Sequence, residues 1–162
     1  MPCPQLPSEL WLEIFHYCSA RDLWLSLRKT NGLLEACAED IICKDILHEF
    51  TISYTFSLGA GTRPRWYDVK PSIILCFSGL SKYNSQYALF DKIAFRPEPY
   101  HQRAWEKWNQ ICCGESVGED WEWKVAWNGE DVRRMKMPRL MISRDHGAWC
   151  DWREMLDGYF SP

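Results

Sequence analysis

Eight cysteines and four histidines are the side chains of this sequence best suited to act as nucleophiles, bases or metal ligands. A nucleophilic thiol needs a histidine beside it, and the sequence offers two such pairs, Cys150 with His146 and Cys113 with His101. Zinc would need cysteines paired at C-x2-4-C spacing, whereas the one close pair is the adjacent Cys112 and Cys113. Nothing marks an oxyanion hole, and several cysteines fall on apolar helical faces. We therefore predict core thiols without disulfides, no metal site and no catalytic residue.

Phosphate binding and carboxylate catalysis also lack a pattern. Gly59 and Gly61 follow an apolar strand, but no third glycine completes a dinucleotide loop, and Pro64 interrupts the helix that should follow. The acidic pairs at 119–120 and 130–131 flank a predicted hairpin, where carboxylates usually face solvent. We therefore expect a binding protein rather than an enzyme, and no cofactor.

Ten tryptophans are the unusual feature of the composition. Tryptophan fills cores, but it is also a frequent anchor of interfaces. Trp121, Trp123 and Trp127 share one face of a predicted strand, so we expect them to be buried. The loop from Gly59 to Tyr67 instead combines arginines with amphipathic rings, and loops run over the surface where binding residues collect. We predict that four of its residues bind the target: Arg63, Arg65, Trp66 and Tyr67.

Apolar residues at helical spacing organise the chain up to about residue 48. Leu10 and Ile14 lie four residues apart and begin the apolar stripe of a first helix that ends near residue 18. Ser19 and Asp22 approximate a capping box for a second helix, and Asn31 is a good cap for a third. We predict three or more short helices that share one core.

From Phe50 the apolar period changes from helical to two, which predicts strands and places a domain boundary near residue 48. Further strands are predicted over 73–77 and 87–95, the second with a break at 91–92. A helix should follow from Tyr100 to Gly114.

Asn128 and Gly129 favour a two-residue type I′ turn, so residues 121–137 should form a hairpin. The return strand changes parity between Val132 and Met135, which predicts a bulge. Asp145 should cap a final helix that ends at Gly158 and bears three large apolar residues: Trp149, Trp152 and Leu156.

The opening of the chain resembles a known docking module. The order Leu6-Pro7-x-Glu9-Leu10-x-x-x-Ile14-Phe15-x-Tyr17, followed by Asp22-Leu23 and Leu27, resembles the F-box, which binds the Skp-type adaptor of Skp–cullin–F-box ubiquitin ligases. The likeness extends to about Leu47 and is similar in style to F-box proteins of filamentous fungi. The adaptor contacts that it implies are Leu6, Pro7, Leu10, Ile14, Phe15, Leu23 and Leu27.

The apolar periods predict an α+β protein with a boundary near residue 48, and the resemblance implies that 1–48 is a three-helix F-box and 49–162 a target-binding domain. The second domain should be an antiparallel sheet with two packed helices. Its function would be to recruit a protein target to the ligase, through the Skp-type adaptor and a cullin. A ligand-binding module, for example for carbohydrate, that carries the F-box as a localisation handle is the alternative. A hydrolase built on Cys150 or Cys113 is a third.

Charge and hydropathy limit the possible partners and the location of the protein. The net charge of −3 and the pI of about 5.8 provide no basic field for nucleic acid. No apolar run approaches the ~20 residues of a membrane span, and the N-terminus lacks the order of a secretory signal. We therefore expect the cytoplasm or the nucleus, with neither nucleic acid nor membrane as a partner.

Overall fold

The computed structural model describes residues 6–57, 70–113, 123–129, 131–143 and 147–161. The chain divides into two compact units, Met1–Glu49 with Leu156–Pro162, and Phe50–Met155. The division after Glu49 lies one residue from the predicted boundary. The last seven residues, predicted as part of the second domain, belong to the first unit instead, because Asp157 bonds to side chains of that unit.

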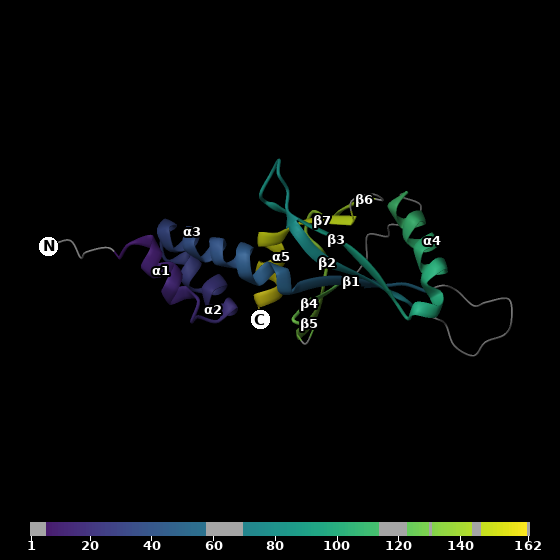
Figure 1. The fold of residues 1–162 in the computed structure, drawn as a ribbon, viewed down its shortest axis with the longest axis horizontal. Coiled ribbons are helices and arrows are strands. Elements are labelled where there is room, and N and C mark those ends of the chain that lie inside the picture. The colour runs from purple at the N-terminus through teal and green to yellow at the C-terminus, as the bar shows by residue number, and fades with distance from the viewer. Residues whose placement is uncertain (1–5, 58–69, 114–122, 130, 144–146, 162) are drawn as a thin grey trace. The chain divides into compact units, whose positions relative to one another are not determined.

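The first unit is helical (Figure 1). Its N-terminal part contains α1 (Ser8–Phe15), α2 (Ala20–Leu25) and α3 (Gly32–Ile41), with the short helical turns η1 (Leu27–Lys29), η2 (Ile42–Ile46) and η3 (Leu47–Glu49). The Ser19 hydroxyl accepts from the Asp22 backbone N–H at 3.1 Å, and the Asn31 side chain accepts from Leu34 N–H at 2.9 Å. Both predicted helix starts are therefore confirmed, whereas α1 ends at Phe15, earlier than predicted.

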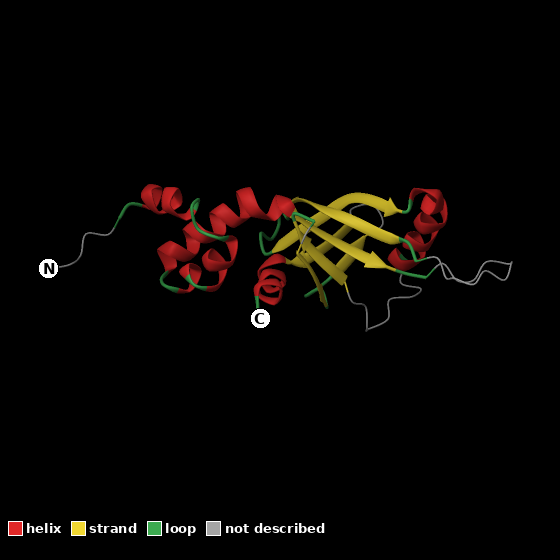
Figure 2. Ribbon diagram, turned by 90° about the horizontal axis from the view of Figure 1, so that it is seen from below, coloured by secondary structure: helices red, strands yellow, loops and turns green. Residues whose placement is uncertain are grey.

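The second unit is built on one antiparallel sheet (Figure 2). Its strands are β1 (Phe50–Thr55), β2 (Ser72–Leu80), β3 (Tyr87–Arg96), β4 (Trp123–Trp127), β5 (Asp131–Met135), β6 (Met141–Ser143) and β7 (Gly147–Asp151). They lie in the order β5-β4-β1-β2-β3-β7-β6. The predicted α+β class with an antiparallel sheet is confirmed.

One face of this sheet carries the core of the second unit. Ile52, Leu75 and Val125 are cross-strand neighbours and are fully buried. The helix α4 (His101–Cys112) packs against β2 and β3, and the ring of Phe95 on β3 meets the rings of His101 and Trp105 edge to face. The alternation that begins at Phe50 therefore marks the buried face of the sheet.

The hairpin and the predicted irregularities differ in detail from the expectation. Asn128 and Gly129 have the positive φ angles of a type I′ turn, but Trp127 pairs with Asp131, so the connection is one residue longer. The predicted bulge in β5 is wrong, because β4 and β5 keep one register throughout. The irregularity predicted at 91–92 is a register shift, at which Asp91 is the extra residue on β3.

The final helix begins later than predicted. Trp149 lies on the strand β7, and α5 covers Trp152–Phe160. The Asp151 carboxylate accepts from the N–H groups of Arg153 and Glu154 at 3.1 and 3.2 Å and therefore caps α5, whereas Asp145 lies outside the described residues. Gly147 starts β7 with a φ of 77°, and a Cβ there would lie 2.2 Å from the carbonyl oxygen of Phe90. Only glycine permits this close strand pairing.

Candidate functional site

The described surface of the first unit carries a row of large aliphatic side chains. Leu6, Leu10 and Ile14 are 42%, 43% and 43% exposed. Leu10 and Ile14 lie four residues apart on α1 and therefore share one face of the helix. Single exposed leucines are common, but several at helical spacing form a patch of the kind that protein partners cover. We call Leu6, Leu10 and Ile14 the apolar ridge.

The other implied adaptor contacts take different positions. Pro7 is exposed and precedes α1, so it lies at the start of the ridge, and Leu27 is half-buried. Phe15 and Leu23 are each 1% exposed and belong to the core of the unit. In this conformation the two side chains offer almost no surface to a partner, and their implied contact with the adaptor stays a prediction.

Two further exposed apolar residues of the first unit were not among the implied contacts. Tyr17 is 93% exposed just beyond the end of α1, and Leu33 is exposed near the start of α3. Tyr17 belongs to the F-box motif in the sequence, so the motif could have marked it as an exposed residue. Leu33 had no such signal, because its neighbour Leu34 provides the buried position of that turn.

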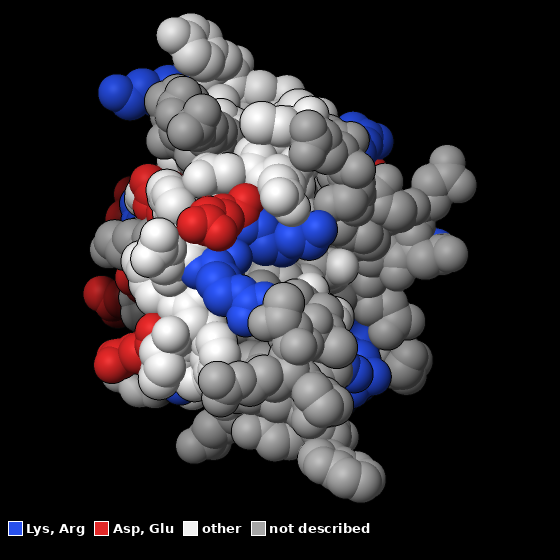
Figure 3. Space-filling view, turned by 90° about the vertical axis from the view of Figure 1, so that its right-hand side faces the viewer, with Lys and Arg blue, Asp and Glu red and all other residues white. Residues whose placement is uncertain are grey.

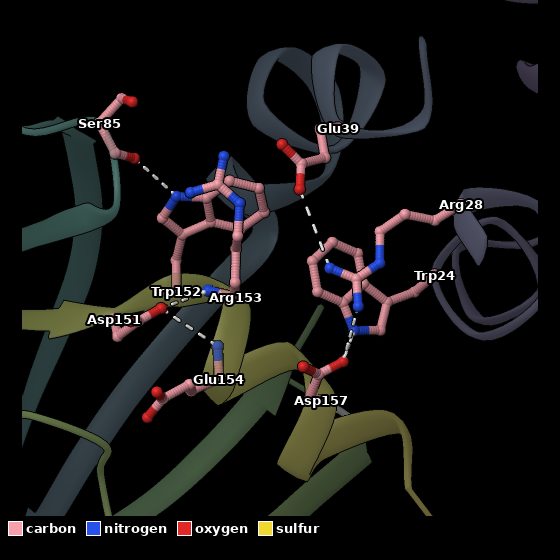
Figure 4. Close-up of polar contacts among 9 residues, drawn as sticks. All are labelled: Trp24, Arg28, Glu39, Ser85, Asp151, Trp152, Arg153, Glu154 and Asp157. Atoms are coloured by element: carbon pink, nitrogen blue, oxygen red, sulfur yellow. Dashed lines mark hydrogen bonds and ion pairs between the residues drawn. The ribbon is translucent and has the colours of Figure 1, made fainter. Parts of the chain in front are cut away.

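A polar cluster within the first unit connects its N-terminal helices to the C-terminal helix α5 (Figure 4). The indole N–H of Trp24 donates to Oδ1 of Asp157 at 2.8 Å, and Arg28 Nη2 donates to the same oxygen at 3.1 Å. The Arg28 guanidinium lies 3.6 Å from the centre of the Trp24 ring, and its Nη1 is 3.8 Å from Oε1 of Glu39. One arginine therefore links η1, α3 and α5, and it covers the buried indole of α2.

The predicted target-binding residues Arg63, Arg65, Trp66 and Tyr67 lie outside the described residues. The remaining tryptophans are informative. Trp24, Trp108, Trp123 and Trp152 are fully buried, and Trp127 is half-buried. Trp105 is exposed at 38%, and one ring contact is to Phe95. Trp121 lies outside the described residues, so the expected burial of the hairpin tryptophans is confirmed in full only for Trp123.

The two cysteine–histidine pairs do not form a described catalytic centre. His101 and Cys113 stand at opposite ends of α4, which places them ~18 Å apart along a helix that rises 1.5 Å per residue. Cys150 is buried beside Met155, and its burial together with the nearby Asp151 raises the pKa of its thiol to about 12. Such a thiol stays protonated near neutral pH and is a poor nucleophile. Its suggested partner His146 lies outside the described residues.

The histidine, cysteine and acidic residues in the described ranges form no cluster of three or more that could hold a metal ion. Within the same ranges no helix is both long and apolar enough to cross a membrane. Comparison with protein-family models, curated proteins and solved structures gives no match to this chain. The resemblance to the F-box therefore depends on the residues of this chain and on where the structure places them.

Proposed function

We propose that this chain is a substrate-recruiting subunit of a Skp–cullin–F-box ubiquitin ligase. Its first unit would dock the Skp-type adaptor through the apolar ridge, and its second unit would hold the protein target. The observation that carries the proposal is the exposure of Leu6, Leu10 and Ile14 on a helical unit whose own core is filled by other residues. The proposal places the chain in the cytoplasm or the nucleus and requires no cofactor.

The support comes from how the motif residues divide between surface and core. A motif that served only to pack a helical bundle would direct all of its large apolar residues inward. Here Phe15 and Leu23 are buried, while Leu10 and Ile14 are left in solvent. Covering those two side chains with a partner would remove apolar surface from water at about 25 cal/mol per Å².

Affinity purification of the full chain followed by mass spectrometry tests the assignment. A Skp-type adaptor and a cullin should be recovered with the chain, and both should be depleted together when Leu10→Glu and Ile14→Glu place charges on the ridge. Met141→Glu with Val132→Glu is the matched control, because it places the same charges on exposed apolar positions of the second unit. Recovery of neither ligase component with the wild-type chain would remove the proposal.

Sugar binding through tryptophan faces is the alternative, and the described structure favours it less. The most exposed described indole, Trp105, contacts Phe95, and four other indoles are fully buried. Titration of tryptophan fluorescence with a panel of sugars separates the two functions. A saturable change in fluorescence, without adaptor recovery, would favour the ligand-binding module.

A further inference from the structure

The second face of the sheet is a described surface that the proposed function leaves unused. Strand pairing places Arg134, Lys124, Ser53, Ile74 and Ala94 side by side across β5, β4, β1, β2 and β3. A parallel row contains Thr55, Ser72 and Arg96, and a third contains Val132, Ala126, Thr51 and Cys76. Side chains alternate between the faces of a strand, so these rows lie opposite the buried Ile52, Leu75 and Val125. We call the three rows the open face.

The open face has the exposure of a surface and not of a core. Arg134, Ala94 and Arg96 are exposed, and the other members, among them Ser53 and Ile74, are half-buried or exposed. The helix α4 packs on the opposite face through Phe95. The sheet therefore presents this face as a broad surface of small, hydroxyl-bearing and apolar side chains.

The charges on the open face have one sign. Lys124, Arg134 and Arg96 belong to it, and no Asp or Glu stands at a described position of its rows. None of these three cations forms an ion pair with another described residue. On the surface that Figure 3 presents, lysine and arginine side chains gather with acidic side chains next to them. The open face is therefore a local cationic surface on a chain whose net charge is −3.

The pairing of Lys124 with Arg134 carries a cost that a ligand would relieve. The two residues are directly opposite each other on neighbouring strands. Side chains so placed have their Cβ atoms about 5 Å apart, and like charges in this position destabilise the pair. An anion bound between the Lys124 ammonium and the Arg134 guanidinium would attract both groups and so offset their repulsion.

From these observations we propose that the open face binds an acidic, extended segment of the target protein. The row from Arg134 to Ala94 crosses five strands and so spans ~19 Å, which matches about six residues of an extended peptide. Carboxylates of the segment would meet Lys124, Arg134 and Arg96. The Ser53 hydroxyl would bond to the backbone or side chains of the segment, and Thr55 and Ser72 would do so with the bonding capacity that they retain beside their mutual hydrogen bond of 2.9 Å. The inference deepens the proposed function, on which it rests, by naming the chemistry of the target.

A peptide fits the open face better than a nucleic acid does. Single-stranded nucleic acid is bound by aromatic side chains on which the bases stack, and the three rows contain no aromatic residue.

The test is fluorescence anisotropy of a labelled decapeptide of alternating glutamate and serine, titrated with the full chain at low ionic strength. Lysine–serine decapeptide and a ten-base oligothymidylate are the comparison probes. The acidic peptide should bind to the wild-type chain, and this binding should weaken with added salt. Its affinity should be lower by about tenfold or more for the chain that carries Lys124→Glu with Arg134→Glu. Arg103→Glu with Lys107→Glu is the matched control, since it changes the net charge equally on α4 and should bind as wild type does.

Three results would overturn the inference: no binding of the acidic peptide, equal losses in both double variants, or tighter binding of the oligothymidylate. If the charge-reversed chain does not melt near the wild-type temperature, Lys124→Gln with Arg134→Gln takes its place and must still weaken binding. Leu10→Ala with Ile14→Ala should bind the peptide normally. Because the assay contains no adaptor, failure here is distinguishable from failure of the docking proposal.

Discussion

The indole Nε1 of Trp24 donates a hydrogen bond to Oδ1 of Asp157 over 2.8 Å, although 133 residues separate the two in the chain. Trp24 is fully buried, so losing Asp157 would deprive its N–H of this acceptor. The last turns of α5 therefore belong to the helical unit that carries the apolar ridge. The integrity of the ridge should depend on residues at the far end of the sequence.

Replacing Asp157 should destabilise the first unit. Asp157→Ala removes the acceptor of both Trp24 and Arg28 and should lower the free energy of unfolding by about 1 to 3 kcal/mol. Asp157→Asn keeps one acceptor oxygen and should cost less. Urea denaturation measures both. Asp40→Ala, which breaks the exposed pair with Lys44, is the control and should leave the urea midpoint close to that of wild type; equal midpoints for Asp157→Ala and Asp40→Ala would contradict the prediction.

Ending the chain at Met155 should unfold the first unit selectively. The deletion removes three buried side chains, Leu156, Tyr159 and Phe160. Each large-to-small change in a core costs about 2 to 5 kcal/mol, so their joint loss approaches the whole stability of a small domain. Circular dichroism should show reduced helix with the β signal retained. A shortened chain with the helical signal of the full chain would show that these residues are dispensable.

Three glycine-to-alanine changes should affect the stability of the protein to different extents, in an order set by the backbone geometry at each position. Gly147→Ala combines a φ of 77° with a Cβ only 2.2 Å from the Phe90 carbonyl oxygen, so it should be the most harmful. Gly129→Ala has a φ of 74° but open space and should cost about 1 to 2 kcal/mol. Gly32→Ala, at the start of α3, should be neutral or stabilising. Melting temperatures measure the order, and a Gly147→Ala chain as stable as Gly32→Ala would disprove the strand geometry at β7.

Thiol labelling should separate surface from core cysteines. Iodoacetamide near neutral pH should modify the exposed Cys113 in the folded protein and leave Cys150 unmodified, because burial raises the pKa of the Cys150 thiol to about 12. Peptide mass spectrometry reads both sites in one sample. In urea both should react. Rapid modification of Cys150 in the folded chain would contradict this prediction and would show that its thiol is reactive.

Local chemistry made much of the fold predictable. Ser19 and Asn31 cap helices through bonds to residues three positions away, so their roles are visible in a short stretch of sequence. The change of period at Phe50 is equally local, since one alternating strand shows which of its residues are buried. The exposed ridge was identified from the motif, although spacing alone did not separate Ile14 on the surface from the adjacent Phe15 in the core.

The features that the sequence did not predict depend on contacts between residues far apart in the chain. Trp149, Trp152 and Leu156 have helical spacing, yet Trp149 pairs with Leu89 on β3, sixty residues away, and lies on a strand. The return of Asp157 to Trp24 and Arg28 likewise has no local signature. The open face depends on the order β5-β4-β1-β2-β3, which brings Lys124, Arg134 and Arg96 to one face from three separate strands.

The most direct test of the docking claim is isothermal titration calorimetry of the purified full chain with a purified Skp-type adaptor. Leu10→Ala with Ile14→Ala should weaken binding by about 2 to 4 kcal/mol, roughly 30-fold or more, while circular dichroism and melting temperature stay close to wild type. Val132→Ala with Met141→Ala, which truncates exposed apolar residues of the second unit, should bind with the wild-type affinity. A folded ridge variant that binds the adaptor as tightly as wild type, or a wild-type chain that does not bind it, would contradict the account.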